Sequence, residues 1–333
     1  SAIVIVAYTT LGGFLAASTS DFIQSIIMSI ALVIVLSYGI ISVGGFDGVV
    51  AHVGDLKGFL SITSTHDGAT NTATPYSVLS IASTLAWGLG YFGMPHILLR
   101  FMAIEDTKKL KLSRRVASVW VVISMSVAVS IGIIGYAMSA EGVIPNLKDS
   151  ETIIVQIAHV LSTHGIIFAI IAGVILAGIL ASTMSTSDSQ LLAASSSVSE
   201  NLLEGVLNLN LSAGVKIVVA RGSVIIISII AMFLASNPNS SVFQIVSFAW
   251  AGFGATFGPV MLFALFWKRS NKYGAISGMV AGGIMVFVWK FLVRPMGGVL
   301  GIYELLPAFI VASIFIVIVS LLTPAPEKEI VDE

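Results

Sequence analysis

Long apolar stretches constrain this chain more than any other feature of its sequence. A helix needs about 20 mostly apolar residues to cross the hydrocarbon core of a bilayer. Nine such stretches follow one another, at residues 1–18, 22–44, 75–100, 116–138, 165–195, 213–235, 242–267, 274–293 and 302–323. They are rich in Gly, Ser and Thr, which let membrane helices pack closely. The sequence therefore predicts an all-α polytopic membrane protein with nine spans.

Composition supports this class and excludes others. Of the 333 residues, 56% are hydrophobic and only 10% are charged, which is far from the balance of a soluble domain. A formal charge of −1 excludes a nucleic-acid-binding protein, because such a protein carries a basic face. The chain has no Cys, and its five His are scattered. These features predict no thiolate or paired-imidazole metal centre and no organic cofactor.

Lys and Arg predict the orientation in the membrane, because they are enriched in cytoplasmic loops. With alternating spans, one side receives Arg100, Lys108, Lys109, Lys111, Arg114, Arg115, Lys216, Arg221, Lys268, Arg269, Lys272 and Lys328. The other side receives Lys57, Lys148, Lys290 and Arg294. The richer side is expected to be cytoplasmic, together with the tail 324–333. The external loop 45–74 then carries an amphipathic stretch, and residues 151–163 form a short external helix.

Three glycines and Pro95 interrupt the third stretch, within residues 88–95. Pro95 has no N–H and disturbs the preceding turn. Irregular backbone at membrane depth persists only where protein or a water-filled cavity satisfies it, and transporters bind solutes at such breaks. Trp87 and Tyr91 are four residues apart and share a face beside this break. The alternative is a packing kink with an aromatic pair at the lipid interface.

Hydroxyl side chains crowd the inner half of the fifth stretch. Ser182, Ser185 and Thr186 share one helix face, and hydroxyl and carbonyl oxygens are suitable ligands for an alkali cation. Ser189 lies one turn below Ser185, and the acid Asp188 lies beside it. The pattern predicts an ion path from mid-membrane to the cytoplasm. The alternative is that the hydroxyls bond carbonyls of their own helix and allow tight packing.

Two further acids lie near the expected ends of spans. Asp21 opens the second stretch, where a carboxylate suits a helix N-terminus, although an acid at the membrane edge is also a functional candidate. Glu304, near the outer end of the last stretch, is expected at the lipid interface. Residues 242–267 have small side chains at close intervals and predict a packing surface.

The segments WGLGYFGMPHILLRFMA and ILASTMSTSDSQLL, in this order, resemble the sodium/solute symporter family and, within it, the bacterial sodium/proline symporters. YTTLGGFLAASTSDFIQ supports the resemblance, which implies a leucine-transporter-like bundle of inverted repeats with thirteen spans. The chain would then be the C-terminal two-thirds, with four N-terminal spans missing. Within one transmembrane domain, residues 1–44 would close the first repeat, 75–267 would form the second, and 274–323 would be peripheral.

The resemblance implies three groups of site residues. Sodium would be coordinated by two hydroxyls and one backbone carbonyl, those of Ser185, Thr186 and Ser182. The solute-binding region would include Trp87, Tyr91 and Pro95. The sodium exit path, or a second sodium site, would use Asp21, Asp188 and Ser189. Two positions depart from the proline-symporter pattern: an Asp at position 188, and Met94 where Gln is more usual.

The sequence thus predicts a symporter that couples sodium to a small solute, preferably proline, by alternating access in a bacterial inner membrane. Its partners would be the solute, the sodium ion and the bilayer, with no nucleic acid and no obligate protein partner. One alternative is a symporter for another amino acid or an organic acid. Another is a transporter-like sensor module, against which the short tail argues. A membrane enzyme would need a convergent His/Asp/Glu cluster, which the sequence lacks.

Overall fold

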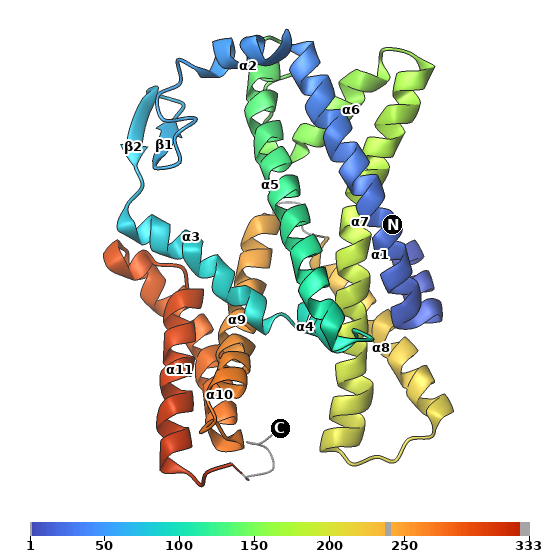
Figure 1. The fold of residues 1–333 in the computed structure, drawn as a ribbon, viewed down its shortest axis with the longest axis vertical. Helices are drawn as coiled ribbons and strands as arrows, with labels where there is room; N and C mark the ends of the chain where they lie inside the picture. Colours follow the sequence, from blue (N-terminus) through green and yellow to red (C-terminus); the bar gives the residue numbers. More distant parts are fainter. Residues whose placement is uncertain (1, 237–240, 327–333) are drawn as a thin grey trace. The chain divides into compact units, whose positions relative to one another are not determined.

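The computed structural model describes residues 2–236 and 241–326, most of which are helical (Figure 1). Lys328 and most of the predicted tail 324–333 lie outside the described residues. The chain divides into two compact units. Unit 1 comprises Ser1–Pro75 and Ile104–Leu234, and unit 2 comprises Tyr76–Ala103 and Ala235–Glu333. The predicted division into repeats and peripheral helices follows other boundaries and stays a prediction.

Unit 1 is built around the packing of its first helix, α1, along α7 and against α5. Its core contains Val35, Ile134, Met138, Ile157 and Ile175. Its helices are α1 (Ala2–Ser42), α2 (Gly45–Val53), α5 (Leu110–Ala140), α6 (Ile153–Ser162), α7 (Ile166–Ser196) and α8 (Ala213–Leu234). A π-helical segment, Ser197–Val206, continues α7. The predicted short helix in residues 151–163 is confirmed by α6.

The first two predicted spans form one helix, α1, with a sharp kink. The kink lies at Gly13. Its φ of 62° and ψ of −155° are sterically allowed for glycine, which has no Cβ. Asp21 therefore lies inside α1, and the prediction that it opens a second span is wrong. The reason is local, because the preceding hydroxyls stay within the helix: Thr19 donates to the carbonyl of Leu15 at 2.9 Å, as Ser and Thr often do.

The predicted external loop 45–74 contains more structure than an amphipathic stretch. After α2, strands β1 (Ser64–Asp67) and β2 (Thr72–Pro75) form an antiparallel hairpin, with Ser64 opposite Pro75. The Asp67 carboxylate closes the turn by accepting from the Ala69 N–H at 2.9 Å and the Thr70 hydroxyl at 2.7 Å. These hydrogen bonds, chiefly that from Thr70, lower the pKa of Asp67.

Unit 2 contains a broken helix and a three-helix group. The broken helix consists of α3 (Val78–Gly90), the 3₁₀ turn η1 (Tyr91–Gly93) and α4 (Pro95–Met102). The group consists of α9 (Val242–Phe266), α10 (Lys272–Val288) and α11 (Leu305–Leu322). Between α10 and α11 lie η5 (Trp289–Val293), η6 (Arg294–Met296) and η7 (Gly298–Gly301). Ala251 and Ala255 of α9 are fully buried, which confirms the predicted packing surface.

Seven helices in the described part of the chain are long and apolar enough to cross a membrane. They are Ile3–Ser42, Thr107–Ala140, Ile166–Val206, Ala213–Leu234, Val242–Phe266, Lys272–Met296 and Leu305–Leu322. The difference from nine has two causes. The first two predicted spans form one kinked helix, and the third is interrupted, so that its longer part, Val78–Gly93, is short. A multi-pass membrane protein is thus confirmed, and the number nine is not.

Candidate functional site

The predicted break in the third span is present, and it lies at Met94. The helix α3 ends at Gly90, a single 3₁₀ turn follows, and Met94 is extended, with φ −80° and ψ 113°. Pro95 then begins α4 at the position where its missing N–H removes no hydrogen bond. Glycines and proline therefore end one helix and start another within the same apolar stretch.

Helix α9 comes very close to this break. A Cβ added at Gly254 of α9 would lie only 2.7 Å from the Cα of Gly90. The Trp250 indole N–H donates to the carbonyl of Trp87 at 2.9 Å. A side chain of α9 thus satisfies a backbone group beside the break, as membrane depth requires.

Five rings form an aromatic cluster at the break: Trp87, Tyr91, Phe243, Trp250 and Tyr303. Trp87 is stacked nearly parallel on Phe243, Trp250 and Tyr303, with centroids 5.6, 5.5 and 5.9 Å away. Tyr91 meets the Trp250 ring edge-on at 4.8 Å and is 51% exposed. Trp87 and Tyr91 therefore share a face, as the sequence predicted. The other three rings were not predicted as site residues.

The predicted sodium ligands come together on one turn of α7. The hydroxyls of Ser185 and Thr186 both donate to the carbonyl of Ser182, at 3.1 and 3.4 Å. This is the hydrogen bonding that the packing alternative expects. A hydroxyl that donates its hydrogen still has lone pairs for a cation, so the three oxygens fit an alkali ion by type.

Asp188 lies deeper in unit 1 and is fully buried. Its Oδ2 accepts a hydrogen bond from the Tyr8 hydroxyl at 2.6 Å, and its Oδ1 accepts one from Ser189 at 3.2 Å. Asp21 acts electrostatically on both Tyr8 and Asp188, and Gln24 hydrogen-bonds to Tyr8. The structure thus groups Asp21, Asp188 and Ser189, and it adds Tyr8 from the short segment before the kink in α1.

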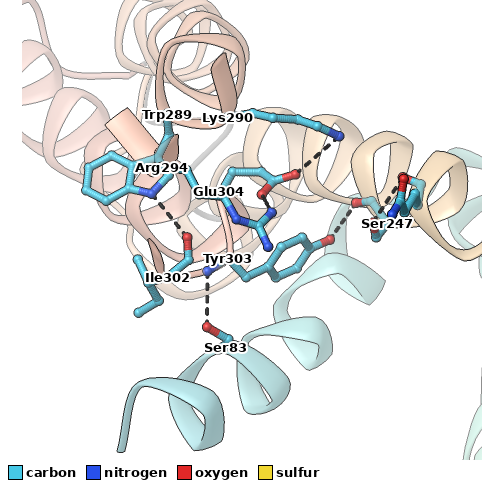
Figure 2. Close-up of polar contacts among 9 residues, drawn as sticks. Ser83, Ser247, Trp289, Lys290, Arg294, Ile302, Tyr303 and Glu304 are labelled. Carbon is cyan, nitrogen blue, oxygen red and sulfur yellow. Dashed lines mark hydrogen bonds and ion pairs between the residues drawn. The ribbon is translucent and has the colours of Figure 1, made fainter. Parts of the chain in front are cut away.

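The predicted solute-binding residues and the predicted sodium residues lie in different units of the chain. The solute residues Trp87, Tyr91 and Pro95 belong to unit 2, and the sodium residues of α1 and α7 belong to unit 1. Glu304 of unit 2 was predicted at the lipid interface, and that prediction is wrong. Its side chain is fully buried, because basic residues following α10 reach it (Figure 2).

Broken and kinked membrane helices, with an acid and grouped hydroxyls inside apolar spans, define a polytopic membrane protein of the secondary-transporter type. The model of the sodium:solute symporter family matches residues 1–282. The chain belongs to this family. The family is one of transporters, which excludes the membrane-enzyme alternative.

Curated relatives match almost the whole chain. It is 40% identical over 330 residues to the high-affinity proline transporter PutP of Bacillus subtilis, covering 99% of this chain and 66% of the relative. It is 39% identical over 332 residues to the osmoregulated proline transporter OpuE of the same species, covering 98% of this chain and 63% of the relative. It is 38% identical over 324 residues to the sodium/proline symporter of Escherichia coli, covering 96% of this chain and 60% of the relative. The chain thus spans less than two-thirds of these relatives.

A solved structure has a similar fold. The chain resembles a Na⁺-coupled sialic acid symporter in a substrate-bound, outward-open state, with a TM-score of 0.73 and 18% identity. The match covers 98% of this chain and 66% of the other. The correspondence to a C-terminal two-thirds of these relatives stays a prediction.

Proposed function

We propose that the protein containing this chain is a sodium-coupled symporter of a small solute, and that the solute is proline. The observation that carries the proposal is the break between α3 and α4 with its aromatic cluster, since a satisfied break at membrane depth is where transporters bind solutes. The names of the relatives in Bacillus subtilis and Escherichia coli supply the solute and the ion.

Each group of residues has a distinct role in this proposal. The solute binds beside Trp87 and Tyr91, with Pro95 maintaining the break. Sodium binds to the hydroxyls of Ser185 and Thr186 and to the carbonyl of Ser182. The neutral oxygens of this turn hold the ion loosely enough to release it.

Sodium leaves past Asp21, Asp188 and Ser189, or a second ion binds there. Two carboxylates give this group more negative charge than the hydroxyl turn, so it attracts a cation toward the cytoplasm. The hydrogen bond from Tyr8 to Asp188 supports this role, because it holds the carboxyl group in place.

The proposed setting is a bacterial inner membrane. The chain would form part of a leucine-transporter-like bundle of inverted repeats, with its C-terminus in the cytoplasm. The distribution of Lys and Arg supports this orientation. Sodium and the solute are the proposed partners, together with the surrounding lipid.

The deciding experiment is uptake of labelled L-proline by the full-length protein in sealed vesicles, with and without an inward sodium gradient. We expect uptake to require sodium and to be blocked by unlabelled proline. Uptake that is indifferent to sodium would overturn the coupling, and a failure of proline to compete would overturn the solute.

A second solute class has one observation in its favour. Met94 is the extended residue at the break and is only 5% exposed. It stands where Gln is more usual in the proline-symporter pattern. A thioether offers less hydrogen bonding than an amide. The same uptake assay should therefore include other amino acids and small organic acids as competitors.

A further inference from the structure

An ion cluster of Lys290, Arg294 and Glu304 lies outside the groups considered so far. The Glu304 carboxylate accepts a hydrogen bond from Arg294 at 2.6 Å and lies 3.8 Å from the Lys290 ammonium (Figure 2). Next to it, the Trp289 indole N–H donates to the carbonyl of Ile302 at 3.1 Å. A buried carboxylate is tolerated only when it is paired, so these contacts fix the start of α11 to the segment that follows α10.

Tyr303 is the direct neighbour of Glu304 in the chain and is held at three points. Its backbone N–H donates to the Ser83 hydroxyl on α3 at 3.1 Å, and its hydroxyl donates to the Ser247 carbonyl on α9 at 2.5 Å (Figure 2). Its ring is stacked on Trp87 at 5.9 Å. Residue 303 therefore connects the ion cluster to the aromatic cluster.

Among the three rings stacked on Trp87, that of Tyr303 is the most firmly fixed. Phe243 is 64% exposed and Trp250 is partly buried, whereas Tyr303 is 7% exposed. Both of its polar groups are hydrogen-bonded within unit 2. Tyr303 therefore gives the Trp87 indole a stacking partner that is itself held in place by two hydrogen bonds.

We propose that Tyr303 is a positioning residue for solute binding, and that the ion cluster holds it against Trp87. The proposal rests on the proposed function, which makes Trp87 a solute contact. A buried ion pair contributes little net stability compared with apolar residues but can specify one geometry. Loss of the Glu304 charge releases the start of α11, and Tyr303 moves with it.

The test uses the full-length protein in proteoliposomes, with uptake of labelled L-proline at saturating sodium. We expect Tyr303→Leu to raise the KM for proline about fivefold, the effect of losing one aromatic pair. We expect a smaller rise for Tyr303→Phe, which keeps the ring and loses only the hydroxyl. The sodium concentration for half-activation should stay the same, which separates positioning from a general structural defect.

A double-mutant cycle tests whether Glu304 acts through Tyr303. We expect Glu304→Gln to raise KM as Tyr303→Leu does, and the double variant to be no worse than either single variant, because coupled residues are not additive. The control is Glu105→Gln, which removes an exposed carboxylate from an i,i+4 surface pair with Lys109. Additive effects, or an equal change in the sodium requirement, would overturn the proposal.

Two further measurements cover the other ways in which the test can fail. If Glu304→Gln does not reach the membrane, the KM values of Tyr303→Leu and Tyr303→Phe still decide whether Tyr303 positions Trp87. If the parent does not transport proline, the proposed solute is wrong, and thiol labelling decides the positioning instead. Gly88→Cys places a single thiol beside Trp87, at an open position in a chain without Cys. We expect Tyr303→Leu to speed its labelling, and an unchanged rate would overturn the proposal.

Discussion

At the scale of single residues, the hydroxyls of α7 show how one contact fits two interpretations. Ser185 and Thr186 donate to the carbonyl of Ser182, which satisfies them within the helix and also collects three oxygens on one turn. The contact alone does not separate packing from ion binding. Removing the hydroxyls does separate them, because packing depends on volume and ion binding depends on the oxygen atom.

We therefore expect Ser185→Ala and Thr186→Ala each to weaken the apparent sodium affinity about tenfold, or ~1.4 kcal/mol. Each change removes one oxygen ligand and little volume. The measurement is the sodium dependence of solute uptake by the full-length protein. The control is Ser187→Ala, whose hydroxyl bonds to Thr183 at 2.8 Å on another face of α7. Normal sodium activation in both variants would return these hydroxyls to the packing interpretation.

Asp188 allows a second prediction at this scale. The Asp188→Asn change keeps the shape and removes the charge, so we expect a lower Hill coefficient for sodium or a slower sodium release. Tyr8→Phe removes the 2.6 Å hydrogen bond and should shift sodium kinetics in the same direction by a smaller amount. Uptake and counterflow at varied sodium measure both. Sodium kinetics identical to those of the parent would show that Asp188 has no role in the ion path.

The sequence singled out several candidate site residues but not the residues that contact them. Trp87, Tyr91 and Asp188 were candidates because aromatic residues beside a helix break, and an acid among hydroxyls, are unusual in a membrane span. Tyr8, Trp250 and Tyr303 were missed, because their contacts join segments far apart in the chain. Tyr8, for example, reaches Asp188 across 180 positions. A helical period carries no information about such a contact.

At the scale of elements, apolar length predicted where most helices lie but not how they bend. The break in the third span was predicted because Pro95 marks it. A boundary between two spans was expected at residues 19–21, whereas the helix continues there and bends at Gly13 instead. Ser and Thr are stable inside a helix when their hydroxyls bond to carbonyls of the preceding turn. The β1–β2 hairpin was missed, because its strands show no apolar alternation.

The close approach of α9 to the break gives an element-scale prediction. Gly254→Ala would place a Cβ 2.7 Å from the Cα of Gly90, a backbone atom that cannot move aside by a rotamer change. Overpacking of this kind costs about 1–3 kcal/mol, so we expect the detergent-solubilised protein to unfold at a lower temperature. The control is Gly88→Ala, because a Cβ there meets no atom within 4 Å. Equal unfolding temperatures for the two variants would contradict the tight contact.

At the scale of the whole molecule, the proposed ion-binding and solute-binding groups belong to different units of the chain. Coupling between them is then a free energy shared by two sites, and it must be reciprocal. Sodium that improves solute binding by some factor is itself bound more tightly, by the same factor, when solute is present.

This coupling can be measured in a binding assay that does not depend on transport. A Cys placed at Tyr91, in a chain that has no other Cys, reports solute binding as protection from a thiol reagent. We expect the proline concentration for half-protection to fall about tenfold when sodium is added, within the usual range of allosteric coupling. Ser185→Ala should reduce that difference, because it removes a hydroxyl proposed to coordinate sodium. Protection by a very high proline concentration should persist. Half-protection at the same proline concentration with and without sodium would show that the oxygens of α7 and the aromatic cluster at the break are not coupled.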